Sequence, residues 1–282
     1  MLAVVGTVPD ANFPFVSGQV ELDDGEIVIC GQRLTINRGT PALLAAAIKT
    51  SLAIGGPPIF AYLAGDIGLG TGSRKLYEYL SENLALTSFQ AITFHYLLPD
   101  VDWHNRVLFA LEEMKQRPVL IADAGYMYAA KMSGQAGFYD FFTPDLGELA
   151  FLADEEAPHP FYTRGFILHE ENCAAEMIAR AYEHDNAARY LLVKGQEDHL
   201  ANDQDVIATI NHPTNEAMEA IGGTGDTLTG ILSALINAQN DPEASAVTAA
   251  KVNRMAGHLS NPNPSTQVLD IIEHIPTALR EH

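Results

Sequence analysis

Short apolar runs alternate with amphipathic helical stretches along most of this chain, and that alternation constrains the fold more than any other feature. Nearly every residue in these runs is apolar, as in strands that are covered on both faces. Strands are expected at 27–30, 59–64, 91–95, 119–122, 190–193 and 206–210. Helices are expected at 41–54, 73–82, 104–115, 145–153, 172–183, 226–238, 242–259 and 266–279. The pattern predicts an α/β fold whose mostly parallel sheet binds ligands at the carboxyl ends of its strands.

The length and composition fit one large α/β unit. Of 282 residues, 47% are hydrophobic, and no repeat, linker or low-complexity run divides the chain. An α/β domain of this size can bury a large core. We therefore expect a single domain over residues 1–282.

The charge balance restricts the partners of the chain. It carries 36 acidic and 16 basic residues, for a net charge of -20. Such a surface repels phosphate backbones and anionic lipids, so we expect a small-molecule substrate, no nucleic acid and no membrane. Cys30 and Cys173 lack the spacing of a disulfide framework or zinc site, which fits a reducing, cytoplasmic location. The sequence leaves open whether the chain forms a homo-oligomer.

No targeting or membrane segment is expected. The first ten residues lack a basic region, and Lys49 and two prolines interrupt the most apolar stretch, 41–65.

The most informative segment is a glycine-rich turn that opens a helix, Gly-Gly-Thr-Gly-Asp at residues 222–226. Free N–H groups at Gly223, Thr224 and Gly225, together with the helix dipole, predict an anion site. Asp226 can remove a proton from a substrate hydroxyl while these amides stabilise a transferred phosphate. The alternative is a tight turn in which Asp226 only complements the helix dipole.

This segment resembles a motif of the ribokinase-like superfamily, whose members carry a Gly-x-Gly-Asp turn with the aspartate as base. Residues 223–231 are most similar to the Gly-Thr-Gly-Asp-x-Leu-x-Gly-Ile of the ADP/ATP-dependent NAD(P)H-hydrate dehydratases. Asn215 and Met218 keep the Asn and Met of that family's Asn-Pro-Gly-Met, and residues 266–280 resemble its closing helix. The resemblance, clearest over residues 190–280, implies a three-layer α/β/α ribokinase-like fold that binds ATP or ADP with Mg²⁺.

A lysine at the end of an expected strand is the candidate phosphate ligand. Lys194 and Gly195 follow strand 190–193 and resemble the family's Val-Leu-Lys-Gly element beside the nucleotide phosphates. Lys194 can supply positive charge that this acidic protein otherwise lacks. The resemblance thus implies nucleotide binding by Lys194, Gly195, Asn215 and Met218. Glu197 and Asp198 depart from the family's small residues, and the alternative is an ordinary strand-end lysine.

Residues 143–148 resemble the dehydratase motif Thr-Pro-His-Pro-Gly-Glu, with Asp145 for His and Leu146 for the second Pro. The same stretch reads Asp-x-x-Glu, close to the Asn-x-x-Glu that the superfamily's kinases use near magnesium and phosphate. Carboxylate oxygens suit magnesium, so Asp145 and Glu148 are expected near substrate or a metal-bound water, with Glu148 as metal ligand. The alternative is a capping box at a helix start.

Asp123 ends the expected strand 119–122 and resembles the first acid of the family's Asp-Ala-Asp element, whose second acid is Gly125 here. Asp123 is therefore expected to contact substrate or a metal-bound water, or else to cap the next turn.

The N-terminal half departs further from the family. The dehydratases' glycine-rich signature and Gly-Pro-Gly-Leu-Gly loop are missing, and Arg38–Gly39–Thr40–Pro41 is their nearest counterpart. The glycine cluster at 65–73 fits neither a Rossmann fingerprint nor a phosphate loop, so we expect a turn into a helix, with a substrate-side turn as the alternative. The histidines lack metal-site spacing, and most are expected at the surface.

The resemblance implies ATP- or ADP-dependent dehydration of hydrated NAD(P)H, with Asp226 as base. The alternatives are a kinase that keeps the phosphoester of a small alcohol, such as a sugar, hydroxymethylpyrimidine or thiazole alcohol, and an inactive nucleotide-binding relative.

Overall fold

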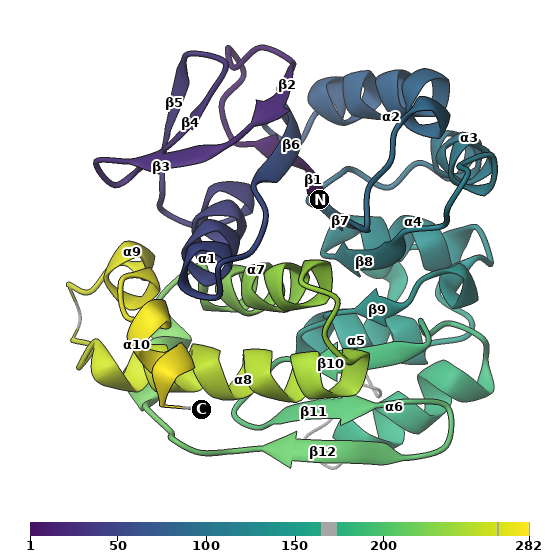
Figure 1. Ribbon diagram of the computed structural model, residues 1–282. Coiled ribbons are helices and arrows are strands. Elements are labelled where there is room, and N and C mark those ends of the chain that lie inside the picture. The colour runs from purple at the N-terminus through teal and green to yellow at the C-terminus, as the bar shows by residue number, and fades with distance from the viewer. Residues whose placement is uncertain (165–173, 264, 282) are drawn as a thin grey trace.

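A nine-stranded sheet organises the protein in a computed structural model that describes residues 1–164, 174–263 and 265–281 (Figure 1). The strand order is β12-β11-β10-β9-β8-β7-β1-β6-β2. All pairs from β10 to β6 are parallel, while β2, β11 and β12 pair antiparallel at the edges. The strands are β1 (Leu2–Val8), β2 (Val16–Gln19), β6 (Ile59–Gly65), β7 (Ala91–His95), β8 (Val119–Asp123), β9 (Phe141–Phe142), β10 (Tyr190–Val193), β11 (Asp198–Ala201) and β12 (Val206–Ile210). The predicted mostly parallel sheet is confirmed.

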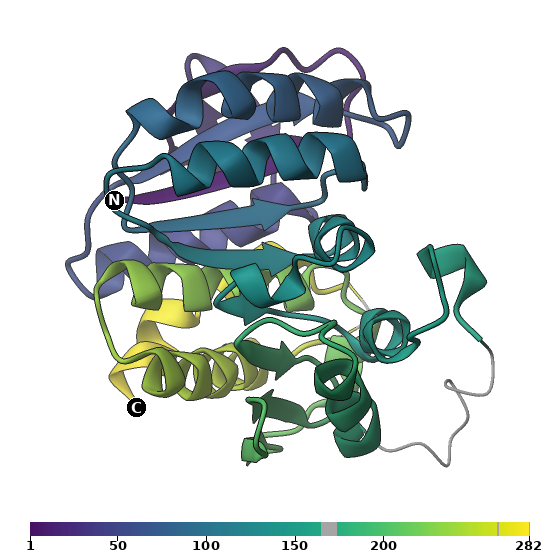
Figure 2. The same ribbon diagram turned by 90° about the vertical axis from the view of Figure 1, so that its right-hand side faces the viewer.

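Helices cover both faces of this sheet, so that it forms the middle of three layers (Figure 2). Alternate strand residues face opposite layers: Leu2 and Val4 join the core under α1, α7 and α8, whereas Ala3 and Val5 join the core under α2 to α6. The helices are α1 (Thr40–Ala53), α2 (Thr71–Asn83), α3 (Val101–Glu112), α4 (Gly125–Met132), α5 (Leu146–Ala153), α6 (Ala174–Glu183), α7 (Thr224–Asn237), α8 (Pro242–Leu259), α9 (Val268–Ile272) and α10 (Ile275–Arg280).

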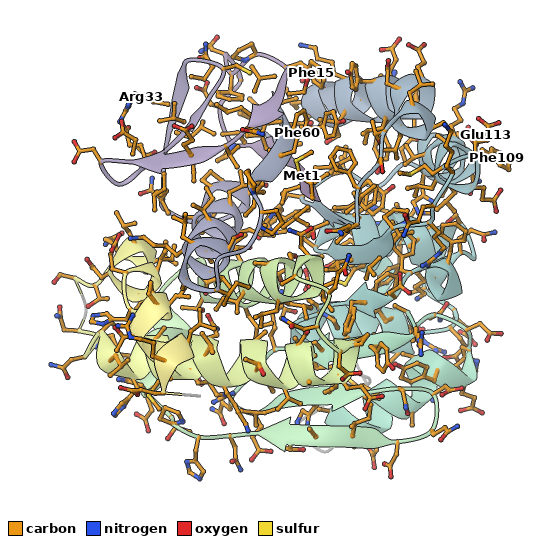
Figure 3. The ribbon with its side chains drawn as sticks, in the orientation of Figure 1. Met1, Phe15, Arg33, Phe60, Phe109 and Glu113 are labelled. Atoms are coloured by element: carbon orange, nitrogen blue, oxygen red, sulfur yellow. The ribbon has the colours of Figure 1, made fainter. Side chains whose placement is uncertain are left out.

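A separate three-stranded antiparallel sheet, β3 (Glu21–Asp23), β4 (Glu26–Ile29) and β5 (Gln32–Thr35), lies at the upper left of Figure 1. The strand expected at 27–30 lies here and not in the central sheet, which corrects the prediction. Gly25 and Gly31 adopt positive φ in the tight turns at the two ends of β4, and these turns join the three strands as hairpins. Arg33, labelled in Figure 3, bridges Asp23 and Glu26 on the outer side of this sheet.

Three further expectations need correction. No strand was expected before residue 27, yet β1 occupies the middle of the sheet with all seven residues buried. Gly6 and Thr7 break the apolar run in that segment and weaken its strand signal. The strand at 206–210 is an antiparallel edge strand with alternating burial, not a buried parallel one. The helix expected at 266–279 is two helices, because Pro276 has no N–H to continue the preceding turn and stands in the first turn of α10, which begins at Ile275.

The fold brings polar side chains together at one edge of the sheet. His95 ends β7 and pairs in register with Asp123 at the end of β8, while Lys194 follows β10. The N-termini of α1 and α7 meet this edge.

Every helix in the described ranges is too short or too polar to span a bilayer. The predicted start of a helix at residue 172, and Cys173, lie outside the described residues; Cys30 is exposed and unpaired.

Candidate active site

Helix α7 begins at Thr224, directly after the glycine turn, and its first N–H groups are open. Gly223 has φ 101°, and a Cβ there would lie 3.2 Å from the Cα of Arg38, so glycine suits both the backbone and the space. Among the described residues, no hydrogen bond reaches the N–H groups of Thr224, Gly225 or Asp226. These amides, with the helix dipole, provide the anion-binding geometry that the sequence predicts.

Asp226 is held away from its own helix, toward α1 and β7, and is 8% exposed. Its Oδ2 accepts the Gly39 N–H at 2.6 Å, and its Oδ1 lies 3.0 Å from His95 Nε2. Burial alone would raise the pKa of Asp226, but His95, Lys194 and the Gly39 N–H outweigh burial and hold that pKa below its ordinary value. An ionised carboxylate offers about four acceptor positions, so these two partners leave room for a substrate proton.

Lys194 and Asp123 form a buried ion pair beside the glycine turn. The Lys194 ammonium donates to both carboxylate oxygens of Asp123, at 2.9 and 3.1 Å. Burial opposes the charge on Lys194, but Asp123 and Glu148 outweigh burial and raise the pKa of the lysine. A Cβ on Gly225 would lie 3.5 Å from the Lys194 Nζ, so the ammonium is next to the open amides. The lysine thus keeps its charge at the anion site.

Asp123 is buried and has several partners within the protein. Besides Lys194, its carboxylate accepts the Thr229 hydroxyl at 2.6 Å and the Ala124 N–H at 2.8 Å. The sequence placed Asp123 near substrate or a metal-bound water, or at the cap of the next turn. Its contacts with Lys194 and Thr229 support a further role, which is to hold the ammonium beside α7.

Asp145 and Glu148 form the capping box that the sequence offered as an alternative. Each carboxylate accepts the backbone N–H of the other residue, at 2.8 Å. Burial, Asp123 and Asp145 raise the pKa of Glu148 to about 8, while Lys194 opposes the shift. The backbone of Lys194 donates to Pro144 at 2.8 Å, which places this box beside the lysine. One oxygen of each acid is used in the box, so the other can bind a metal.

Two of the other residues predicted to bind nucleotide, Gly195 and Met218, contact α8. Arg254 of α8 donates to the Gly195 carbonyl at 2.9 Å, and Met218 packs on Gly257 one turn further along. Asn215 caps the short helix η5 (Glu216–Ala220) by accepting the Ala217 N–H. Gly195 and Met218 thus both contact α8, and the contact of all these residues with a nucleotide stays a prediction.

The two acids that follow Lys194 turn away from it. Asp198 is buried and pairs with Arg254 at 2.7 Å. Glu197 is exposed and accepts a hydrogen bond from Asn211. These contacts neutralise or remove the negative charge that the sequence placed near the phosphate lysine.

Sequence reasoning missed the residues that hold Asp226. His95 is fully buried, and its Nδ1 lies 3.0 Å from the hydroxyl of Thr40, which is fully buried as well. His95 ends a correctly predicted strand, as Asp123 does, so a polar residue at a carboxyl strand end was the available signal. Tyr96, half-exposed beside the site, has its pKa raised to about 12 by burial, Asp226 and Asp123.

The group His95, Asp123 and Asp226 also has metal-like spacing, with ligand atoms within 4.8 Å of one another. Hydrogen bonds explain that spacing, because His95 contacts Asp226 and the Lys194 ammonium already neutralises Asp123. The residues that fit magnesium are Asp145 and Glu148, which offer unused hard oxygens and stand beside the phosphate lysine.

Comparison with solved structures identifies the fold. The chain superposes on an ADP/ATP-dependent NAD(P)H-hydrate dehydratase of Bacillus subtilis, co-crystallized with ATP/Mg²⁺, with a TM-score of 0.60 and 12% identity, covering 99% of this chain and 89% of that one. Phosphofructokinase-2 of Escherichia coli, in complex with fructose-6-phosphate, gives a TM-score of 0.55 at 12% identity and covers 99% of both chains. These likenesses confirm the predicted ribokinase-like fold.

The family is defined by sequence. A carbohydrate-kinase family model, described as NAD(P)H-hydrate dehydratase, matches residues 97–277. Because that match spans more than half of the chain, the protein belongs to this family. The match begins at residue 97, just after His95, which agrees with the weaker resemblance of the N-terminal part to this family.

Individual relatives agree with this assignment. An uncharacterized protein of Methanocaldococcus jannaschii is 39% identical over 238 residues, which are 84% of this chain and 98% of that protein. The ADP-dependent (S)-NAD(P)H-hydrate dehydratase of Cenarchaeum symbiosum is 28% identical over 62% of this chain and 55% of its own. The bifunctional NAD(P)H-hydrate repair enzyme of Pyrobaculum aerophilum is 28% identical over 63% of this chain, and the match spans only 32% of that enzyme.

Proposed function

We propose that this protein is an ATP- or ADP-dependent dehydratase of hydrated NAD(P)H, with Asp226 as the base. The observation that carries the proposal is an ionised, nearly buried carboxylate beside open helix amides and a charged lysine. Family membership and the dehydratases among its relatives support the substrate. The expected location is the cytoplasm.

Phosphorylation of the substrate hydroxyl is the first step. Asp226 takes the hydroxyl proton, the oxygen bonds to the terminal phosphorus of the nucleotide, and the bond from that phosphorus to the bridging oxygen breaks. The bridging oxygen leaves with the electron pair. The amides of Thr224 and Gly225 and the Lys194 ammonium stabilise the charge on the transferred group. A positioned base contributes about 10²- to 10⁴-fold to the rate.

Elimination is the second step. The carbon–oxygen bond breaks, phosphate leaves with its electron pair, and loss of a proton from the neighbouring carbon forms the double bond. The same amides and Lys194 stabilise the leaving phosphate. Magnesium, when bound by Asp145 and Glu148, supplies positive charge to the nucleotide phosphates.

The test is product analysis with hydrated NADH and either ATP or ADP. The proposal predicts that NADH and inorganic phosphate appear together, one for one, with the matching nucleotide product. A phosphoester that survives in the product mixture would contradict it. Nucleotide binding by calorimetry without turnover would indicate the inactive relative.

A kinase that stops at the phosphoester is the second candidate. It is favoured by Asp145 and Leu146, which replace the His and Pro of the dehydratase motif. The resulting Asp145-x-x-Glu148 is close to the pattern of the superfamily's kinases. A panel of small alcohols with labelled ATP separates the two, since only the kinase transfers label into a stable product.

A further inference from the structure

A buried hydrogen-bonded chain leads from α1 through β7 to the proposed base. The Thr40 hydroxyl lies 3.0 Å from His95 Nδ1, and His95 Nε2 lies 3.0 Å from Asp226 Oδ1. Thr40 and His95 are fully buried, and Asp226 is 8% exposed. The other groups that face the imidazole are Asp123, whose Oδ2 lies 3.8 Å from Nε2, and the ring of Tyr96.

The contacts assign the protons along this chain. Asp226 is ionised and can only accept, so His95 Nε2 carries the hydrogen between them. The Thr40 hydroxyl has no other hydrogen-bond partner among the described residues, and a buried hydroxyl needs an acceptor. With the hydroxyl as donor to Nδ1, the ring hydrogen of His95 stands on Nε2.

The order hydroxyl, imidazole, carboxylate is that of a nucleophilic triad, but the reactive end differs. The Thr40 hydroxyl is enclosed and cannot meet a substrate. His95 is enclosed too, so it cannot touch the substrate either. Of these three residues, only Asp226 reaches the surface.

Helix α9 shows how an aspartate at the same helix position bonds when no histidine holds it. Asp270 occupies the third position of α9, as Asp226 does in α7, and its carboxylate accepts the backbone N–H of Gln267 at the start of its own helix. Asp226 is drawn instead to His95 and Gly39. The carboxylate of Asp226 therefore leaves the start of α7 uncapped, unlike that of Asp270 in α9.

We infer that His95 is a positioning residue, which holds the Asp226 carboxylate toward the substrate and keeps it from capping α7. The role in turnover rests on the proposed function. Its hydrogen bond fixes Oδ1 while the Gly39 N–H fixes Oδ2, so the carboxylate is held at both oxygens and each oxygen keeps an acceptor position. Thr40 sets the tautomer that makes this bond.

Two amide variants separate this role from a general need for a buried polar group. In His95→Gln the side-chain nitrogen is separated from Cα by the same number of bonds as Nε2 of histidine. It can therefore still donate to Asp226. In His95→Asn the nitrogen stands at the distance of Nδ1 and cannot. We expect His95→Asn to lower kcat about 10- to 100-fold with nucleotide affinity retained, and His95→Gln to recover most of the loss.

His104 supplies the matched control. It is also fully buried, and it lies 2.8 Å from the Tyr139 hydroxyl and 3.0 Å from the Ser133 hydroxyl, away from Asp226. His104→Asn and His104→Gln are expected to change stability but not kcat. Equal kcat values for the two His95 variants, or a parallel loss in the His104 pair, would overturn the inference.

NMR of the ring nitrogens in histidine-labelled protein tests the arrangement without turnover. The inference predicts that His95 carries its ring hydrogen on Nε2, and that the Nε2 resonance shifts in Asp226→Asn and not in His104→Gln. A His95 that carries its proton on Nδ1, or one insensitive to Asp226→Asn, contradicts it. If the wild type turns over none of the substrates, the proposed function fails, and the NMR result still decides the position of Asp226.

Discussion

Two glycine-rich turns open helices at the same edge of the sheet, and they use their aspartates in opposite ways. In the turn before α2, Asp66 accepts the N–H groups of Gly68, Leu69 and Gly70 and both the N–H and hydroxyl of Ser73. In the turn before α7, Asp226 accepts no hydrogen bond from its own turn. The first turn satisfies its own amides, whereas the second leaves them open.

Glycine and aspartate together therefore do not define an anion site. Asp66 lies inside its loop and fixes the loop's shape, which supports the structural interpretation of residues 65–73. Asp226 becomes available for chemistry because partners from other elements, Gly39 and His95, hold it outside its loop. Partners from distant segments decide which role the carboxylate has.

Loss of the Asp226 charge should have the largest effect. Asp226→Asn keeps the shape of the side chain but removes the base, so we expect kcat to fall at least about 10²-fold with nucleotide affinity retained. Steady-state kinetics and calorimetry with ATP and ADP measure both quantities. Asp66→Asn is the matched control, with unchanged kcat expected. Full activity in Asp226→Asn would remove the contrast between the two turns.

Loss of the Lys194 charge should affect nucleotide binding next most strongly. Lys194→Ala removes the ammonium beside Gly225 and leaves Asp123 with only its other partners, so we expect nucleotide affinity to fall about 10- to 100-fold. Lys131→Ala is the control, because Lys131 is a buried lysine that donates to the Phe151 and Asp154 carbonyls instead. Unaltered affinity in Lys194→Ala would exclude Lys194 from the site.

Loss of the Asp66 charge should act on stability rather than on turnover. Asp66→Asn keeps one acceptor oxygen and loses charge-assisted bonds to the loop, so we expect the free energy of unfolding to fall by about 2 kcal/mol. Urea unfolding at neutral pH measures the change. A variant as stable as the wild type would show that the loop does not depend on Asp66.

The acid dependence of stability should be the smallest effect. The pKa of Asp66 is lowered because hydrogen bonds from Ser73, Gly70 and Gly68 outweigh burial, which would raise it. The unfolded chain then binds more protons than the folded chain, so this contribution is present above about pH 4 and is lost as the pH falls through the folded pKa. Urea unfolding between about pH 5 and about pH 2 should show that the free energy of unfolding falls less steeply with falling pH in Asp66→Asn than in the wild type. Equal slopes would contradict the assignment.

Local patterns predicted most of the central architecture. The strands at 91–95 and 190–193 and the helix at 242–259 match their observed bounds, because burial and helical periodicity leave clear local signals. The central strand β1 was missed, since Gly6 and Thr7 interrupt its apolar run. Strand direction at 206–210 depends on pairing with β11 and is not encoded locally.

The candidate site was predictable only in part, and for a similar reason. Asp226, Gly225 and Lys194 carry local motif signals, and the fold places them together. His95 carries none and Thr40 lies only in the nearest counterpart of a family loop, because their importance comes from contacts between residues far apart in the sequence. The role of Asp123 as partner of Lys194 likewise depends on two strands that meet only in the folded sheet.

The location of a bound nucleotide tests the central claim most directly. A crystal structure with ATP or ADP and magnesium should place the terminal phosphate at the N–H groups of Thr224 and Gly225 and the Lys194 ammonium, with Asp226 facing the reacting oxygen. A nucleotide whose phosphates lie at the turn of residues 65–73, or anywhere away from α7, would contradict the account.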